Sequence, residues 1–556
     1  MAGTASIAQR IDGYIDGLFA GWNIYTTILT VLLVGYLISP LFLSTEPDVH
    51  PMLLERQASI ARVTQSDTES AIHRNLAVPE GFPLRSGLNI KDPGAARWTA
   101  GRDGDLRDIW RQAITNIITG VNSGKSVISV HGKGDITKHN LEDLSKEINV
   151  IGKHVLKLKA TRVAIYLPNS TEFLVSFFAA AFYGFTPILI APGQPLETML
   201  QLLRETRADA LIVAAGTVPL EAISKFVPAF KSVISVVSKT SRQLDFLTDE
   251  ASAQWHDIIK NGFGQTTADL PSSSQQNEPN MVSVWFNDVT EHKPSSYCVV
   301  EYSQKNIIAA IAAQLAALPR GHAFEPLDVV LPLESLTNTY PLAICLAALF
   351  SGASIAMTSI ASSSADYDLA FQQGFSPSIV ITSAQTMRKA YDNWMTNLRK
   401  GFFSKLNHYR KLRSLATGTF RTNSASPRLI YVSDKGVHSG VFYDSRQLAD
   451  LRVFTGSRII YALTTANVAG AIAQTNPLDY RAVRQDGRWS HFGAPVTAIE
   501  IKLVDLCETK CSNIHRVGDI VAMGPAVVGG STNTEIEAMI RTDGTLTLSP
   551  LSPLCD

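Results

Sequence analysis

The sequence predicts an α/β protein of two or three packed units, preceded by one apolar N-terminal helix. Three observations predict this class. Short apolar runs alternate with runs of helical spacing, as in βα units around a mostly parallel sheet. The chain has 556 residues, more than a single hydrophobic core usually organises. No charged residue occurs between Gly17 and Thr45.

Composition excludes some classes of function. The 49 basic residues balance the 49 acidic residues, and no basic tail is present, so we expect no nucleic-acid partner. The five cysteines are scattered and odd in number. Cys507 and Cys511 form the one close pair, and zinc is an alternative there. Because no second pair or histidine cluster accompanies them, we expect reduced thiols and no metal site.

The N-terminal region divides into three predicted segments. Residues 1–22 form an amphipathic segment, since isoleucines recur in it at helical spacing. Residues 23–45 form a transmembrane helix, because the apolar run that starts at Ile24 and ends at Leu43 is long enough to cross a hydrocarbon layer. A buried core helix is the alternative. Residues 46–100, rich in Pro, Gly and charge, form a linker.

Two predicted α/β subdomains follow, residues 101–275 and 276–456, with a Ser/Gln/Asn-rich break before the second. Alternating apolar and amphipathic runs predict the elements of both. In the first we expect helices 106–121, 139–158, 172–182 and 196–204 and strands 162–167, 187–190 and 210–213. In the second we expect strands 281–286, 329–331, 354–357 and 379–381 and helices 307–318 and 342–350.

The loop between strand 281–286 and helix 307–318 has the position of a phosphate-binding loop. Such a loop holds an anion with glycine-rich backbone N–H groups, hydroxyls and a lysine. No glycine occurs between Ser283 and Asn306. The loop has Asp288 and Glu291 instead, whose charge repels a phosphate.

A basic run at residues 394–428 has two interpretations. Four aromatic residues, Trp394, Phe402, Phe403 and Tyr409, are interleaved with its basic residues. These are, before the final arginine, Arg399, Lys400, Lys405, Arg410, Lys411, Arg413 and Arg421. A solvated basic face explains it, and so does a surface that rests on anionic lipid.

Six segments, in order, resemble the adenylate-forming superfamily of acyl-CoA synthetases, luciferases and adenylation domains. They are VAIYLPNSTEFLVSFFAAAFYGFTPILIAP (163–192), VLPLESLTNTYPLAICLAALFSGASIAM (330–357), SRIIYALTTA (457–466), FGAPVTAIEIKLVD (492–505), RVGDIVAMGPAVVGG (516–530) and RTDGTLTL (541–548). The resemblance implies a large acyl-CoA synthetase-like domain of stacked αβαβα subdomains plus a small distorted β-barrel. Residues 457–556 would contain the adenine-motif region and the β-rich end of that domain.

The motifs of the superfamily are degenerate in this chain. In the phosphate loop Thr290 matches, and in the adenine motif Tyr461 and Thr464 match. These three residues are the candidates for nucleotide binding, and their alternative role is purely structural. The metal-binding acid of the motif is Thr465 here, and the gate histidine is Ser335.

The C-terminal end departs further from the superfamily. After Asp543 no residue corresponds to the ribose-binding aspartate, and we expect the C-terminal lid domain with its catalytic lysine to be missing. Adenylation needs fixed positive charge at the reacting phosphorus. We therefore expect no catalytic residue and no bound cofactor.

Three hypotheses remain. The first is a membrane-anchored, catalytically degenerate acyl-CoA synthetase-like protein that binds an acyl ligand or serves as a scaffold or regulator in lipid metabolism. It would be a single-pass protein of the endoplasmic reticulum membrane with a cytosolic main domain. The second is an active long-chain fatty acid–CoA ligase that uses ATP, Mg²⁺ and CoA with an atypical loop or a lid supplied in trans. The third is a membrane tether whose globular domain binds a protein partner.

Overall fold

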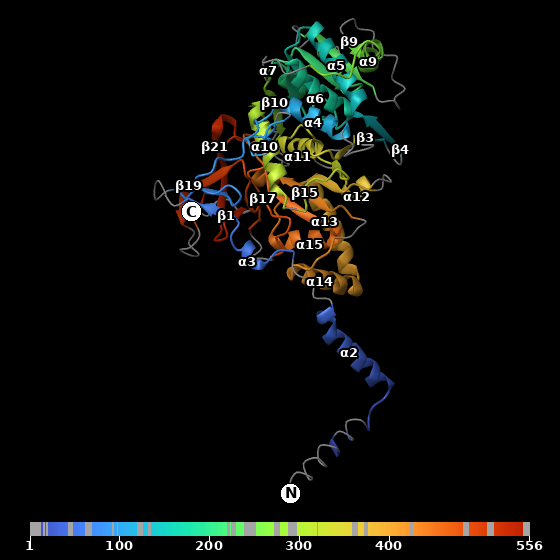
Figure 1. The fold of residues 1–556 in the computed structure, drawn as a ribbon, viewed down its shortest axis with the longest axis vertical. Helices are drawn as coiled ribbons and strands as arrows, with labels where there is room; N and C mark the ends of the chain where they lie inside the picture. Colours follow the sequence, from blue (N-terminus) through green and yellow to red (C-terminus); the bar gives the residue numbers. More distant parts are fainter. Residues whose placement is uncertain are drawn as a thin grey trace.

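The computed structural model gives three β-sheets and a projecting N-terminal helix (Figure 1). It describes residues 13–14, 17, 20–42, 48–61, 69–91, 94–96, 98–118, 126–131, 135–219, 223, 230–237, 252–271, 279–286, 297–319, 321–358, 365–371, 376–422, 426–481, 489–508 and 516–548.

The first sheet has seven strands, parallel except at the β10–β11 edge. Their spatial order is β11 (Tyr297–Tyr302), β10 (Met281–Phe286), β6 (Thr186–Leu189), β5 (Arg162–Tyr166), β7 (Ala210–Ala214), β8 (Ser232–Val236) and β9 (Ser252–Gln254). Helices cover both faces, because the successive apolar side chains of the buried central strands point to opposite faces of the sheet. In β5, Val163 and Ile165 face the large core, whereas Ala164 and Tyr166 face a second core.

The second sheet has nine strands, and its six central strands are parallel. Their order is β18 (Ala494–Pro495), β17 (Ala473–Gln474), β16 (Arg458–Leu463), β15 (Leu429–Asp434), β14 (Ile379–Ser383), β12 (Val329–Pro332), β13 (Ser354–Thr358), β3 (Ser126–His131) and β4 (Asp135–Asn140). The edge pairs β3–β4, β16–β17 and β17–β18 are antiparallel.

The third sheet is antiparallel and has six strands. Their order is β1 (Ala58–Ile60), β2 (His73–Asn75), β19 (Glu500–Glu508), β20 (Arg516–Met523), β21 (Ser531–Ile540) and β22 (Leu546–Leu548). It is the β-rich end of the domain. The segment predicted as a linker, residues 46–100, therefore supplies two strands of this sheet.

Helices link and cover the sheets. They are α3 (Pro51–Leu54), α4 (Leu106–Ile118), α5 (Leu141–Lys157), α6 (Thr171–Tyr183), α7 (Leu196–Glu205), α9 (Trp255–Phe263), α10 (Gln304–Ala317), α11 (Thr339–Phe350), α12 (Tyr367–Phe371), α13 (Ala384–Lys400), α14 (Phe402–Ala416) and α15 (Ser445–Thr455), with the 3-10 turns η1 (Gly436–Ser439) and η2 (Val528–Gly530).

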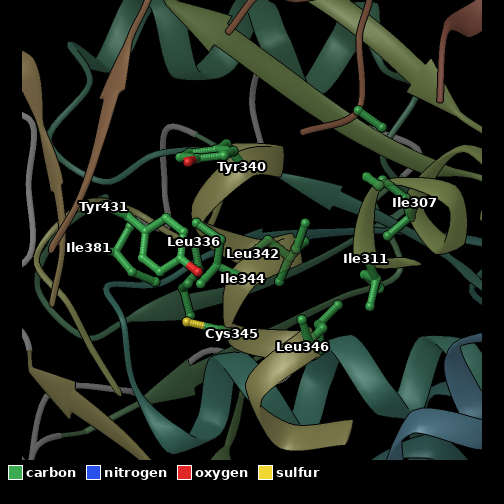
Figure 2. Packing of buried hydrophobic residues seen from close by; sticks show 14 of the residues in the cluster. Ile307, Ile311, Leu336, Tyr340, Leu342, Ile344, Cys345, Leu346, Ile381 and Tyr431 are labelled. Carbon is green, nitrogen blue, oxygen red and sulfur yellow. The ribbon is translucent and has the colours of Figure 1, made fainter. Parts of the chain in front are cut away.

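The core lies between the two α/β sheets, where α4, α6, α10 and α11 pack (Figure 1). In Figure 2, Ile307 and Ile311 of α10 lie near Leu346 of α11, and Tyr340 lies near Tyr431 of β15. Because α11 is apolar on all sides and buried almost throughout, it requires this position between two layers.

The predicted α/β elements are confirmed, but their assignment to sheets differs from the predicted subdomains. Strands β3 and β4 lie within the predicted first subdomain and join the second sheet. Strands β10 and β11 lie within the predicted second subdomain and complete the first sheet. Each sheet therefore takes strands from distant parts of the chain, which local periodicity does not specify.

The prediction for residues 23–45 requires a correction. These residues form α2 (Ile24–Phe42), a 19-residue helix that projects from the body (Figure 1). Its large apolar side chains from Ile24 to Val34 are exposed. Within the described residues, no helix combines the length and the apolar character that crossing a membrane requires, so the predicted span is not found.

Candidate functional site

The ends of β10, β15 and β16 meet the third sheet at one cavity of about 310 Å³. Ligands of open α/β sheets bind outside the carboxyl ends of parallel strands. The cavity is lined by Trp285, Cys298, Lys435, Thr464, Thr465, Ala466, Asn467, Thr532, Asn533, Thr534, Glu535 and Ile536. All three sheets therefore contribute. Half of the lining residues are threonines and asparagines, and Lys435 and Glu535 add one charge of each sign.

Lys435 provides the positive charge of the described lining. It follows β15 directly, and its Nζ donates a hydrogen bond of 2.7 Å to the backbone oxygen of Phe286, the last residue of β10. The same Nζ lies 5.7 Å from the ring centroid of Trp285. Lys435 thus links the second sheet to the first at the C-terminal end of β10.

Two other side chains of the lining have reactive or unused polar atoms. The Oγ1 of Thr465 is buried and has no hydrogen-bond partner among the described residues. A buried hydroxyl of this kind can accept or donate a hydrogen bond to a ligand in the cavity. Cys298 has a free thiol on an exposed residue, and its partial desolvation together with the charge of Glu205 raises its pKa.

Tyr461 of β16 is fully buried and does not belong to the cavity lining. Its hydroxyl donates a hydrogen bond to the carboxylate of Asp434. Its ring stacks on Phe492 at a centroid distance of 4.5 Å and meets Tyr443 edge-on at 5.4 Å. Burial raises the pKa of Tyr461 well above its ordinary value, and the charge of Asp434 adds to the shift.

Asp434 organises the turn after β15. Its Oδ1 accepts hydrogen bonds from the backbone N–H of Gly436 at 2.8 Å and from the hydroxyl of Ser439 at 2.6 Å. Gly436 has a φ of +63°, a backbone conformation that glycine adopts without strain. The turn directs Lys435 toward β10.

Thr464 contributes to the lining and also forms hydrogen bonds with the turn after β15. Its backbone N–H and its Oγ1 both donate to the backbone oxygen of Asp434, at 2.8 and 2.9 Å. The structure therefore brings Tyr461 and Thr464 together around Asp434. Thr290, the third predicted binding residue, lies outside the described residues, as do Asp288 and Glu291.

The loop predicted between strand 281–286 and helix 307–318 is shorter than expected. Strand β11 pairs antiparallel with β10 along its full length, Met281 opposite Tyr302 and Phe286 opposite Tyr297. Helix α10 begins only after β11, with a capping box between Ser303 and Asn306. A strand thus separates the loop from the helix N-terminus that would help to hold a phosphate.

A second polar cluster lies at the end of β12. Glu334 is buried; its carboxylate accepts hydrogen bonds from Ser433 and, at 2.7 Å, from Asn338. Ser335, at the gate position of the resemblance, pairs with the hydroxyl of Thr337 at 2.9 Å. These contacts are internal to the fold.

Asp543 belongs to a third cluster, distinct from the cavity lining. Arg481 bridges Asp479 and Asp543 at 2.9 and 3.1 Å. Burial by itself would raise the pKa of Asp479, but its bonds to Arg481 hold that pKa below the ordinary value. Across the described residues, no three His, Cys, Asp or Glu side chains come together in a way that could hold a metal ion.

Comparison with known proteins identifies the family. The sequence profile of the family described as AMP-binding enzyme matches residues 126–531, well over half of the chain. The chain belongs to this family. The match runs from β3 to the first residue of β21. It includes β10, β15, β16 and the part of the cavity lining that they contribute, whereas the lining residues 532–536 of β21 follow it.

Solved structures show the same fold at low sequence identity. The anthranilate CoA ligase AuaEII, in complex with anthranoyl-AMP, is 15% identical, with a TM-score of 0.57 over 80% of this chain and 76% of that one. A benzoate CoA ligase from Burkholderia xenovorans LB400 is 12% identical, with a TM-score of 0.55 over 80% of this chain and 79% of that one. The adenylate-forming fold predicted from sequence is therefore confirmed.

One curated relative also matches over most of its length. It is an uncharacterized protein from Saccharomyces cerevisiae, 22% identical over 521 residues, which is 89% of this chain and 88% of the relative.

The sequence could reveal the residues around the cavity only in part. The adenine-motif resemblance located Tyr461 and Thr464, whereas Asp434 and Lys435 had no signal in the sequence analysis. Asp434 is the last residue of the buried strand β15, and Lys435 follows it directly, before a glycine. That pattern of polar residues at a strand end could have revealed them.

Proposed function

We propose that this member of the AMP-binding enzyme family is a ligand-binding protein that does not catalyse adenylation. The ligand is an acyl-adenylate or a related nucleotide-linked carboxylate, held in the cavity between β10, β16 and β21. The protein would act as a binding or regulatory component of lipid metabolism. One observation carries the proposal: the motif tyrosine Tyr461 is fully buried against Asp434 and Phe492 and is not part of the cavity lining.

The cavity supports a polar ligand with an anionic group. Its volume of about 310 Å³ is at the lower end of the range of small-molecule sites. The hydroxyl of Thr465 and the ammonium of Lys435 can donate to phosphate oxygens, whereas the carboxylate of Glu535 can accept from ribose hydroxyls. Trp285 offers an aromatic surface. The solved relative AuaEII contains anthranoyl-AMP, a ligand of this chemical class.

The charge of the lining favours binding over adenylation. Negative charge grows on the phosphorus as a carboxylate displaces pyrophosphate, and enzymes offset it with several fixed cations. In the described lining the cation is Lys435, and its ammonium already donates to Phe286. Loss of one such donor typically costs a factor on the order of a hundred in rate.

Calorimetry on the purified full chain tests the proposal. A non-hydrolysable acyl-sulfamoyl adenosine series should bind with measurable heat and stabilise the fold, whereas pyrophosphate exchange into ATP should stay at background. The variant Thr465→Phe should abolish binding, because its ring enters the cavity and no hydrogen bond recorded among the described residues is lost. Thr99→Phe, at an exposed position outside the lining, is the matched control.

Two results would contradict this function. If no member of the series binds, the cavity is not a nucleotide site. If pyrophosphate exchange proceeds with a fatty acid at the rate of an active ligase, the alternative of an ATP-dependent acyl-CoA ligase is correct.

The cellular location is a separate part of the proposal. We place the protein at the endoplasmic reticulum membrane with its main domain on the cytosolic side, and the exposed apolar side chains of α2 support this location. Leu29→Glu combined with Leu33→Glu should release the protein from the membrane fraction. Leu53→Glu with Leu327→Glu, two exposed leucines elsewhere, should not. Equal release of both variants would contradict it.

A further inference from the structure

Helix α14 exposes a group of large apolar side chains. The exposed fractions are 76% for Phe402, 82% for Phe403, 50% for Leu406 and 65% for Tyr409. Phe402 and Phe403 also contact each other edge-on at 5.8 Å. A contiguous exposed apolar group on a folded protein indicates an interaction surface.

The helix has distinct inner and outer faces. On the inner face Leu415 is buried and His408 packs on Phe454 at 4.6 Å. The Nε2 of His408 is also 2.8 Å from the carboxylate of Asp450 on α15. Positions three or four residues apart share a helix face. Phe403, Leu406, Arg410 and Arg413 follow that spacing on the opposite side, which we call the α14 outer face together with Phe402 and Tyr409.

The surroundings of the α14 outer face are positive. No acidic residue occurs between Asn393 and Ser433, although the whole chain has no net charge. Seven cations of this segment form no ion pair with a carboxylate in the described part of the chain. They are Arg399, Lys400, Lys405, Arg410, Lys411, Arg413 and Arg421.

The α14 outer face lies at the end of the body from which α2 projects (Figure 1). The chain that follows α2 is fixed beside the C-terminal end of α14. The backbone N–H of Asp48 donates to the oxygen of Gly418 at 3.0 Å, and its carboxylate pairs with Arg458 at 2.6 Å. Two helices with exposed apolar side chains, one of which also carries cations, therefore lie at this end.

We propose that the α14 outer face is a docking surface for an anionic lipid bilayer. Cations near such a surface are attracted by its negative potential, and aromatic side chains favour the headgroup boundary. A bilayer would cover Phe403 and Leu406 and pair with Arg410 and Arg413 at the same time. This inference specifies the surface and the lipid class for the proposed membrane location, and it is independent of the cavity ligand.

Flotation of the full chain with lipid vesicles tests the docking surface. We expect stronger binding to vesicles of phosphatidylcholine with phosphatidylserine than to phosphatidylcholine alone, and the difference should shrink as salt rises. Arg410→Glu with Arg413→Glu should lower binding to the anionic vesicles by a factor on the order of ten or more. It should leave binding to neutral vesicles unchanged. Phe402→Ser with Phe403→Ser should lower binding to both kinds.

The matched control makes the same charge change on a distant helix. Lys153→Glu with Lys157→Glu alters two exposed lysines of α5, at the opposite end of the body (Figure 1), and should bind as the unmodified protein does. Because all these side chains are exposed, the variants should unfold at the temperature of the unmodified protein. If Arg410→Glu with Arg413→Glu unfolds at a lower temperature, Arg410→Gln with Arg413→Gln replaces it.

Three results would overturn the docking surface. One is equal binding of the unmodified protein to neutral and anionic vesicles. Another is unchanged vesicle binding by both α14 variants. The third is loss of single-stranded RNA binding in the arginine variant while its vesicle binding stays intact, which would assign the surface to nucleic acid. Failure of the α2 variants alone would contradict the location but leave this surface supported.

Discussion

The hydroxyl of Tyr461 donates a hydrogen bond to the buried carboxylate of Asp434, and the two residues join neighbouring strands of the nine-stranded sheet. Asp434 also fixes the turn that positions Lys435 at the cavity. A tyrosine of the adenine motif is thereby part of the support of the site. Through this contact and its stacking on Phe492, Tyr461 contributes to the packing of the nine-stranded sheet.

Tyr461→Phe should lower the free energy of unfolding by about 1–3 kcal/mol, because a buried carboxylate loses a donor. The affinity for an acyl-adenylate analogue should stay within a factor of about two, since the tyrosine does not line the cavity. Urea denaturation and calorimetry measure the two effects. Tyr409→Phe, which removes an exposed hydroxyl, is the control. Full stability with lost binding would show that Tyr461 acts on the ligand.

The α/β elements of this fold could be predicted from sequence because their periodicity is local. The strand RVAIY at β5 and the helix that begins after Ser170 are examples: the hydroxyl of Ser170 accepts the N–H of Phe173, and Gly184 ends the helix at a φ of +78°. Such signals lie within a few residues of the element that they specify.

The pairing of distant strands could not be predicted in this way. Strand β2 carries the sequence His-Arg-Asn and pairs with β19, more than four hundred residues away, through Arg74 opposite Glu500. Three polar residues give no strand periodicity by themselves. Likewise, strand β11 occupies part of the segment that was expected to be a loop. It forms a strand by pairing with β10, and this pairing is not visible in its own sequence.

The candidate site was predictable only in part. A resemblance located Tyr461 and Thr464, but the role of each depends on Asp434, which belongs to another strand. Lys435 reaches β10 across a junction of two sheets. A contact between sheets is a property of the tertiary structure, so no local pattern shows it.

Lys435→Met should weaken the binding of an anionic ligand by a factor on the order of ten or more, because a charge-assisted hydrogen bond is lost. Binding of uncharged adenosine should change little. Isothermal titration with both ligands measures the difference, and Lys435→Arg should retain most of the affinity for the anion. Equal losses for adenosine and the anion would indicate that Lys435 supports the cavity only through its bond to Phe286.

Arg428→Ala should destabilise the second sheet by about 3 kcal/mol, because it leaves the buried carboxylate of Asp328 without its cationic partner. The guanidinium donates to both oxygens of Asp328, at 2.8 and 2.5 Å, and to the backbone oxygen of His322 at 3.0 Å. Asp328 is 4% exposed. Arg421→Ala, at an exposed arginine, is the control for denaturation experiments. If Arg428→Ala combined with Asp328→Ala were no more stable than Arg428→Ala alone, the stranded charge would not be the cause.

His491 should make stability depend on pH in a defined window. Burial lowers its pKa from 6.5 to about 4, so the unfolded chain binds a proton between these values and the folded chain does not. Stability therefore falls as pH decreases through this window, by on the order of 3 kcal/mol from this group. This contribution of His491 to stability is fully present above the pKa that the histidine has in the unfolded chain.

His491→Gln should remove that contribution from the pH profile. Its free energy of unfolding, relative to the unmodified protein, should rise as pH is lowered from about 7 to about 4, whatever constant cost the substitution itself has. Urea denaturation across this range measures the effect, and His256→Gln, at an exposed histidine, is the control. Parallel profiles for His491→Gln and the unmodified protein would mean that His491 has the same pKa in the folded and the unfolded chain. In that case the neighbouring carboxylates Asp479 and Asp543 would offset its burial.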